Sequence, residues 1–347
     1  MYSPCSSTES FSAIQPDDHI SIRLNDFNLS SKCFYSGGTL SIDSEDTRVI
    51  FTKYAIESAL RYLEARNIPI QPFHLKTWGD ISSVKNEETG KEMKVGFGSS
   101  AAAVVAIIGA VIQYHSNSSF TQQDKEAIFK LSIISHYLGQ GKLGSGFDVA
   151  ASTFGGALIY RKFDPEWLQQ KISTDSQSNL VNEEWPLLQC IPINLPADLV
   201  MMVGFTGTSA STKKLVQEMK LYKQKDPDSY YTIISRIADV TEKLIEAIQS
   251  KNQVAILKLL DQNRILLEEL SFACSCHLEI EAHQIMSHTA SKYGAVAKFS
   301  GAGGGDCSVG VCFNAINAAL IVKEWIKNGI MPIDIEFSSE GMKIEKG

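Results

Sequence analysis

Apolar positions recur along this chain with periods that predict both helices and strands. Between residues 46 and 65 they fall mostly on one face of a helix, and a second amphipathic helix is predicted over about 121–138. Alternating segments predict strands in "HISIRL", "QPFHLKTW" and "GALIYRKF". The run from Ala101 to Ile112 is different, because it is apolar on every side. Such a helix is expected to be buried all round.

The second half of the chain restarts with a predicted strand after Pro196. We place the domain boundary there, which gives an N-terminal lobe of residues 1–195 and a C-terminal lobe of residues 196–347. Two or three long helices are predicted over about 211–290, followed by a strand, a glycine-rich loop, the strand "CSVGVCF", a helix near 316–328 and a terminal β-like pair. This order of strands and helices lacks the regular βαβ alternation of a doubly wound sheet, and it predicts an α+β protein with two lobes.

Two polar segments interrupt the pattern. "SSVKNEETGKEM" is predicted to be a surface hairpin or excursion. "QQKISTDSQSNLVNEEW" shows no periodicity, and we expect an exposed insertion there.

Composition narrows the class of protein. The 347 residues, with 44% hydrophobic and 20% charged side chains, describe a globular chain of roughly two domains. A net charge of −7 argues against a partner as acidic as duplex nucleic acid. The first twenty residues lack the pattern of a secretory signal, and the apolar run is too short to cross a bilayer. We therefore expect a cytoplasmic protein without a nucleic-acid or membrane partner.

The cysteines suggest no metal site. Seven cysteines without regular spacing are typical of reduced thiols in a cytosol. Cys274, Cys276 and His277 are spaced too tightly for a usual zinc site, so a buried helical position is the better interpretation.

The stretch "GFGSSAAAVV" from Gly96 suggests an anion site. Glycines let backbone N–H groups approach phosphate oxygens, and the start of a helix adds partial positive charge. Ser99 and Ser100 fall in the first turn, where a hydroxyl can cap the helix or ligate Mg²⁺. A tight turn before a core helix explains the same residues equally well. The stretch matches neither a Walker motif nor a dinucleotide fingerprint.

Two further stretches carry candidate chemistry. In "GKLGSGFDVAAS", Lys142 and Ser145 are candidates for holding a substrate while Asp148 meets its hydroxyl or phosphate group; the alternative is a helix-capping aspartate. "SGAGGGDCSVGV" places four glycines and Asp306 between two predicted strands. A loop pressed against an anionic ligand explains so many glycines better than a plain hairpin does.

Two aromatic positions keep two interpretations each. Trp78 ends a predicted strand, where it either stacks near an adenine base or belongs to the core. His136 precedes the "GQGK" turn, where it either approaches a substrate phosphate or lies on a helix face.

These motifs resemble a known family. "GFGSSAAA", "GSGFDVAAS" and "KFSGAGGGD" are similar, in order, to the motifs of the GHMP kinase superfamily. "GQGKLGSGFDVAAS", "VGFTGTSASTKKLV" and "AVAKFSGAGGGDCSVGV" resemble its phosphomevalonate kinase branch more than the mevalonate kinases. The resemblance runs from about residue 45 to the C-terminus. It implies an N-terminal lobe like ribosomal protein S5 domain 2, a ferredoxin-like C-terminal lobe, and the substrates ATP and phosphomevalonate with Mg²⁺.

The resemblance also implies roles for particular residues. Asp148 would face the acceptor group, and Ser145 and Gly146 would lie against phosphomevalonate. Ser100 would be a ligand of Mg²⁺. The residues implied in ATP binding are Gly96, Gly98, Ser99, Ser100, Ala101, Gly301, Gly303, Gly304 and Gly305. A weaker signature implies that Thr206, Gly207, Ser211 and Thr212 lie near the site.

The chain departs from the family in two places. Family members usually open with a strand carrying a "PGK"-type lysine, whereas this sequence begins "MYSPCSSTESFSAIQPDD" and has no lysine before Lys32. Either the sequence is short by some tens of residues, or the N-terminal lobe lacks the usual first strand. Mevalonate kinases carry a glutamate on Mg²⁺ eleven residues before the aspartate, and Tyr137 occupies that position here.

Overall fold

The computed structural model describes residues 9–79, 83–85, 92–116, 120–142, 144–174, 177–208 and 212–344. The chain separates into two compact units. The N-terminal unit contains Thr8–Ile81, Phe97–Ile193 and the end of the chain from Phe337. The C-terminal unit contains Ser82–Gly96 and Asn194–Glu336.

A five-stranded sheet organises the N-terminal unit, with the strand order β1-β5-β2-β3-β4. Its strands are β1 (Ser10–Pro16), β2 (Ser21–Leu24), β3 (Leu29–Ser36), β4 (Thr39–Ile42) and β5 (Phe73–Gly79). β5 pairs in parallel with β2 and antiparallel with β1. The predictions for "HISIRL" and "QPFHLKTW" are confirmed as β2 and β5. The opening stretch, to which the sequence analysis assigned no strand, forms β1 at the edge of this sheet.

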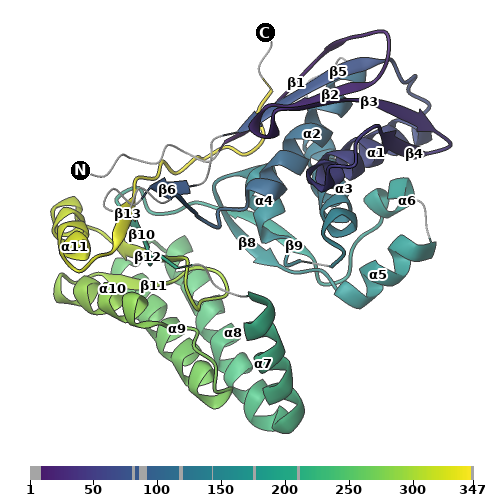
Figure 1. Ribbon diagram of the computed structural model, residues 1–347. Coiled ribbons are helices and arrows are strands. Elements are labelled where there is room, and N and C mark those ends of the chain that lie inside the picture. Colours follow the sequence, from purple (N-terminus) through teal and green to yellow (C-terminus); the bar gives the residue numbers. More distant parts are fainter. Residues whose placement is uncertain are drawn as a thin grey trace. The chain divides into compact units, whose positions relative to one another are not determined.

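Three long helices pack together beside this sheet (Figure 1). They are α1 (Ile50–Ala65), α2 (Ser99–Ser116) and α3 (Gln122–Gln140). By length and composition, α2 is long and apolar enough to cross a membrane, and it is longer than the apolar run from which it was predicted. In this unit, however, α2 packs on α1, α3 and β1, and Val104, Ile108 and Val111 are fully buried. The prediction of an apolar core helix is confirmed, but α2 is not buried all round, because Ala102, Ala106 and Ala110 are only partly buried.

Local sequence sets both ends of α3. At its start, the Thr121 hydroxyl accepts from the Asp124 N–H (3.2 Å), and the Asp124 carboxylate accepts from the Thr121 N–H (2.8 Å), which is a capping box. At its end, the N–H of Gly141 donates to the Tyr137 carbonyl (2.8 Å). The turn that carries Lys142 and Ser145 therefore begins at a fixed point, directly before α4 (Phe147–Phe154).

The polar segment 169–185 is not an exposed insertion, and that prediction is wrong. It lies within α5 (Pro165–Thr174), α6 (Gln177–Asn182) and the turn that follows, beside the hairpin β8 (Ala157–Arg161) and β9 (Gln189–Ile193). Leu180, Val181 and Trp185 are buried in the core of the unit. The Trp185 indole N–H also donates to the Leu180 carbonyl (2.9 Å). Burial of these apolar side chains therefore fixes a segment whose average composition is polar.

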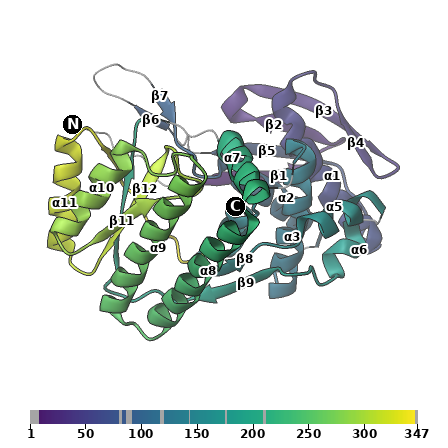
Figure 2. The same ribbon diagram turned by 90° about the horizontal axis from the view of Figure 1, so that it is seen from below.

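The C-terminal unit is built on a four-stranded antiparallel sheet in the order β11-β12-β10-β13. Its strands are β10 (Val200–Phe205), β11 (Val296–Phe299), β12 (Cys307–Cys312) and β13 (Met331–Ile333). Its helices are α7 (Thr212–Lys225), α8 (Pro227–Gln249), α9 (Gln253–Ala273), α10 (Glu281–Lys292) and α11 (Ala315–Lys327). α8 and α9 lie side by side (Figure 2). The strand order and the positions of the crossover helices are those of a ferredoxin-like fold, so the α+β prediction is confirmed.

Some details of this unit differ from the sequence predictions. Four helices, α7 to α10, occupy the region predicted to hold two or three. The polar segment after residue 81 contributes the paired strands β6 (Ser83–Lys85) and β7 (Glu92–Lys94), which agrees with the predicted hairpin. The predicted terminal β-like pair is wrong for the described residues up to 344, where β13 is the only strand after α11.

The residues after β13 return to the N-terminal unit. We call the described part of this return, residues 337–344, the C-terminal segment. The N–H of Met342 donates to the Thr153 carbonyl (3.2 Å) in α4, and the N–H of Gly156 donates to the Ser338 carbonyl (3.0 Å). The Met342 side chain packs against the core of the unit, beside Gly109 of α2. The segment therefore supports α2 and α4 together.

One cysteine pair departs from the expectation of reduced thiols. Cys274 and Cys276 form a disulfide at the end of α9. Ser275 between them has a positive φ of 54°, which turns the chain so that the two Cα atoms lie 5.4 Å apart. Cys33, Cys190, Cys307 and Cys312 are free.

Candidate active site

The glycine-serine turn leads directly into α2. Helix α2 begins at Ser99, and the Gly98 carbonyl accepts from the Ala101 N–H (2.9 Å), while Ala101 itself is 1% exposed. The N–H groups of the first helical turn have no intrahelical acceptors, which makes this end a favourable place for an anion. Gly98 has φ 74°, and a methyl group on it would lie 3.1 Å from Cβ of Asp148. Two motifs fifty residues apart in the sequence therefore meet in the N-terminal unit.

His136 contacts the serine rather than standing alone on a helix face. Its Nε2 lies 3.1 Å from Oγ of Ser100, and its ring packs on Phe51 with centroids 5.1 Å apart. Burial lowers the pKa of His136, which favours the neutral ring. A neutral imidazole that accepts the Ser100 proton leaves the oxygen lone pairs of that hydroxyl available. Neither open interpretation of His136 included this contact.

Asp148 lies in the first turn of α4 without capping it. The N-cap is Gly146, and no side chain caps the helix. The capping alternative is therefore wrong, because Asp148 is the second residue of the helix, two positions after the N-cap. Asp148 is half-buried, and burial raises the pKa of its carboxyl group. A half-buried carboxylate beside a glycine turn is typical of a functional group rather than of a solvated surface.

Tyr160, which carried no predicted role, supports the turn before Asp148. Its hydroxyl donates to the Ser145 carbonyl (2.8 Å), and it lies so close to Gly146 that a side chain there would collide with it. Ser145 itself is half-buried, and Lys142 is exposed. The alternation of "GALIYRKF" predicted the strand of Tyr160, but nothing in it predicted this contact fifteen residues away.

The glycine-rich loop of the C-terminal unit joins the antiparallel strands β11 and β12. Its inner part is anchored, because the N–H of Gly304 donates to the Leu278 carbonyl (2.7 Å) and Gly303 packs against the same carbonyl. Gly303 and Gly305 are buried, Gly304 is half-buried, and Gly301 is exposed.

Asp306 closes this loop in a conformation that is uncommon for a side-chain-bearing residue, with φ 57°. Its N–H donates to the Thr208 carbonyl (2.7 Å), and its own carbonyl accepts from the Thr206 N–H (2.9 Å). Its carboxylate also faces Gly96, since a methyl group there would lie 3.7 Å from Oδ1. The "VGFTGT" signature and Gly96 thus meet the end of the glycine-rich loop within one unit.

The remaining candidates are placed as follows. Ser211 lies outside the described residues, and Thr212 begins α7. Trp78 is 37% exposed and stacks on Phe11, with centroids 5.5 Å apart, so it is not a core residue. Lys298, which the sequence analysis did not single out, lies in β11 just before the loop, and burial lowers the pKa of its amine.

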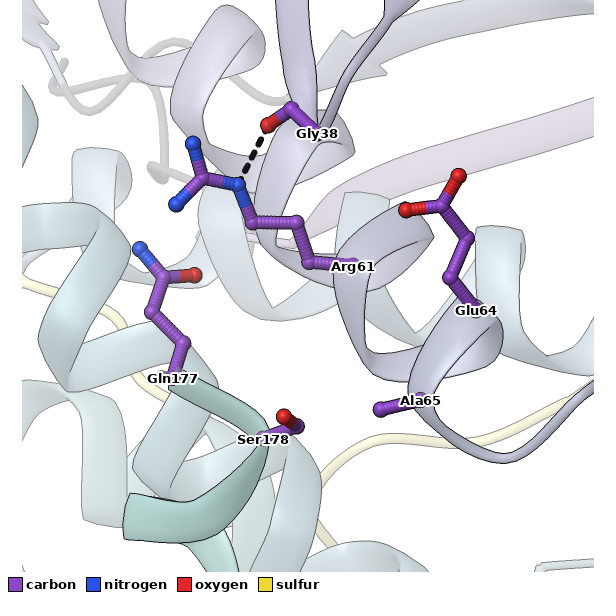
Figure 3. A pocket seen from close by; sticks show the side chains of 6 residues that line it. All are labelled: Gly38, Arg61, Glu64, Ala65, Gln177 and Ser178. Carbon is purple, nitrogen blue, oxygen red and sulfur yellow. Dashed lines mark hydrogen bonds between the residues drawn. The ribbon is translucent and has the colours of Figure 1, made fainter. Parts of the chain in front are cut away.

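A separate pocket of about 390 Å³ lies in the N-terminal unit (Figure 3). Arg61 and Gln177 extend into it from α1 and α6. The Arg61 guanidinium donates to the Gly38 carbonyl and pairs with Glu57 (3.1 Å), so it ties the β3–β4 turn to α1. None of the residues predicted from the motifs lines this pocket.

The described residues contain no group of three or more His, Cys, Asp or Glu side chains placed to hold a metal ion. This does not conflict with Mg²⁺, which usually takes one or two protein ligands and completes its shell with phosphate oxygens and water. The Ser100 hydroxyl and the Asp148 carboxylate, both neighbours of Gly98, are oxygen donors of that kind.

Comparisons with known proteins agree with these motifs. The model of the GHMP kinases N terminal domain matches residues 53–156. The phosphomevalonate kinase of Streptomyces sp. (strain CL190) is 26% identical, over 83% of this chain and 74% of that protein. The phosphomevalonate kinase of Saccharolobus solfataricus is 30% identical, over 73% and 70%. The mevalonate kinase of Pyrococcus abyssi is 31% identical, over 72% and 65%.

Solved structures share the fold. The Lin0012 protein from Listeria innocua superposes with a TM-score of 0.83 at 28% identity, covering 94% of this chain and 87% of that one. The Streptococcus pneumoniae phosphomevalonate kinase in complex with phosphomevalonate and AMPPNP has a TM-score of 0.74 at 22% identity, covering 92% and 87%. Together with the order of the three glycine-containing motifs, these similarities establish that the chain belongs to the GHMP kinase family.

Proposed function

We propose that this protein is a phosphomevalonate kinase, which transfers the γ-phosphoryl group of ATP to phosphomevalonate and releases diphosphomevalonate and ADP. The observation that carries the proposal is the contact between Asp148 and Gly98, which joins the acceptor motif to the glycine-serine turn. Similarity to phosphomevalonate kinases over most of the chain supports the choice of acceptor.

The glycine-serine turn is assigned to the ATP phosphates. Backbone N–H groups of Ser99 and Ser100 at the start of α2 would hold them. The Gly301–Gly305 loop of the C-terminal unit is assigned, separately, to nucleotide binding. A helix N-terminus contributes only ~0.3–1 kcal/mol, or ~2 in a partly buried site. Enzymes must lower barriers by at least ~8 kcal/mol, so alignment of the reactants has to supply much of the rest. Bound Mg²⁺, with Ser100 as a ligand, would neutralise phosphate charge.

The turn before α4 is assigned to phosphomevalonate. Lys142 is exposed, and we assign it to the anionic acceptor; Ser145 and Asp148 are held in place by Tyr160 and by the start of α4. The acceptor group is itself a phosphate that is largely ionised near neutral pH. A strong base is therefore unnecessary, and we assign Asp148 the role of orienting the acceptor.

This role predicts a moderate effect of charge removal. We expect Asp148→Asn to lower kcat about tenfold, below the ~10²–10⁴-fold loss typical of removing a general base. Asp18→Asn, at an exposed site in the same unit, is the matched control and should keep wild-type kcat. The measurement is steady-state ADP release at saturating ATP. An Asp148→Asn enzyme with unchanged turnover would show that the carboxylate has no essential role.

The proposed function is tested by ADP release from this chain with Mg-ATP, offering phosphomevalonate and mevalonate separately. We expect turnover with phosphomevalonate and none with mevalonate. Turnover with mevalonate alone would instead assign the chain to mevalonate kinase, the alternative that the Pyrococcus abyssi similarity favours. No turnover with either, together with binding of Mg-ATP, would favour a non-catalytic nucleotide-binding protein.

A further inference from the structure

His283 lies beneath the glycine-rich loop, fully buried at 0% exposure. It belongs to the first turn of α10, and its ring packs on Phe299 of β11 with centroids 5.8 Å apart. Its Nε2 is 3.1 Å from the carbonyl oxygen of Gly305, and its Nδ1 accepts from the Ile280 N–H (3.3 Å). Both ring nitrogens therefore have partners, one in the loop and one at the start of the helix.

These two partners specify one state of the ring. Nδ1 faces an N–H donor and must be unprotonated, while Nε2 faces a carbonyl oxygen and must carry the proton. Only the neutral Nε2–H tautomer makes both bonds, since a protonated ring would place two N–H groups against each other at Ile280. Burial lowers the pKa of His283, whereas the backbone carbonyls of Gly305 and Leu278 and the carboxylate of Asp306 act in the opposite direction. The neutral form is thus consistent with the surroundings of the ring.

The bond to Gly305 acts on one particular peptide group. The Gly305 carbonyl and the Asp306 N–H belong to the same planar unit. His283 donates to the carbonyl, and the Asp306 N–H donates to the Thr208 carbonyl (2.7 Å). This peptide is therefore held from both ends, and its orientation fixes where the inner part of the loop presents its other backbone groups.

We propose that His283 is a positioning residue for nucleotide binding, which holds the Gly305–Asp306 peptide through its Nε2–H. The proposal rests on the function assigned above to the Gly301–Gly305 loop. Because His283 is fully buried, it acts through the backbone of the loop. Its removal should therefore weaken nucleotide binding, while the affinity for the acceptor stays unchanged.

Two near-isosteric variants separate the two bonds of the ring. In His283→Asn, the amide oxygen replaces Nδ1 and keeps the bond from Ile280, but nothing reaches Gly305. In His283→Gln, the longer amide N–H reaches Gly305, while the acceptor for Ile280 is lost. We expect His283→Asn to raise the Kd for Mg-ADP and the KM for ATP about tenfold, and His283→Gln to stay near wild type. The KM for phosphomevalonate should not change in either variant.

The measurements are calorimetric titration with Mg-ADP, the split of KM against kcat, and amide hydrogen exchange of residues 304–306. Equal losses in the two variants, or a wild-type His283→Asn, would overturn the proposal. If neither variant folds, ¹⁵N NMR of the wild-type His283 ring tests the proposal. A charged ring or an Nδ1–H tautomer would contradict the neutral Nε2–H form that the two hydrogen bonds require. Failure of the wild type to bind Mg-ADP would count against the proposed function instead. The tautomer of the ring and the hydrogen exchange of residues 304–306 would still test whether His283 holds the Gly305–Asp306 peptide.

Discussion

Replacing Gly98 with alanine is expected to lower kcat/KM for phosphoryl transfer about a hundredfold while the protein stays folded. The left-handed backbone at Gly98 costs an alanine roughly 1–2 kcal/mol. Its methyl group would also lie 3.1 Å from Cβ and 3.2 Å from Cγ of Asp148, so the carboxylate or the turn must move. A displacement of ~1 Å between reacting groups can cost ~10²-fold in rate. Steady-state ADP release, with a thermal unfolding curve for each variant, measures this effect.

Gly37→Ala is the matched control for this substitution. Gly37 also has a left-handed backbone, with φ 57°, and no described atom would lie within 4 Å of the added methyl group. It carries the same kind of backbone cost at a turn to which we assign no part in binding or catalysis, so wild-type kcat/KM is expected. If Gly98→Ala were as active as Gly37→Ala, the close approach of Gly98 to Asp148 would have no catalytic consequence.

Replacing Gly155 with alanine is expected to lower the free energy of unfolding by about 3–5 kcal/mol. Gly155 ends α4 with φ 67° and ψ −170°, a conformation that is essentially restricted to glycine. A side chain there would also overlap the backbone of Glu340 and Gly341 in the C-terminal segment. The segment would have to leave the surface, and the contacts of Met342 would be lost with it. Thermal and denaturant unfolding should show a drop in Tm of ~10 °C.

Two controls separate the backbone strain of alanine at position 155 from the effect of displacing the C-terminal segment. Gly141→Ala places alanine at the left-handed end of α3, where no described atom lies within 4 Å, and should cost about 1 kcal/mol. Removing residues 337–347 should destabilise the protein, and adding Gly155→Ala to that deletion should then cost much less than it does in the full chain. Fully additive losses would show that the segment and Gly155 do not act together.

Much of the fold could be predicted from the sequence, because the long helices and central strands carry clear periodicity. α1 and α3 have enough turns for their apolar faces to be recognised, and α2 was recognised by its uninterrupted apolar run. α5 and α6 do not, since ten and six residues complete too few turns to show a period. β1, β3 and β4 were missed for another reason. β1 and β4 are the edge strands of the sheet, and β3 lies between β2 and β4. Each of the three buries at most one residue, and β1 (SFSAIQP) buries none.

The candidate site could also be predicted only in part. Glycine spacing revealed the two loops, because backbone approach to phosphate demands small residues at adjacent positions. The residues that hold those loops were not predicted. His136 reaches Ser100 across thirty-six positions, and His283 reaches Gly305 across twenty-two. A single histidine within an amphipathic helix gives no sign of its distant partner, so such contacts require the folded structure.

The return of the C-terminal segment has a consequence for synthesis of the protein. The N-terminal unit is complete only when residues from Phe337 onward have joined it, yet Asn194–Glu336 must be made first. At ~5–20 residues per second, translation of that intervening part lasts on the order of 10 s. During that time the nascent unit exposes the apolar surface near Gly109 that Met342 later covers. Nascent chains should therefore be a preferred target of chaperones that recognise exposed apolar surface, until the C-terminal segment has joined the N-terminal unit.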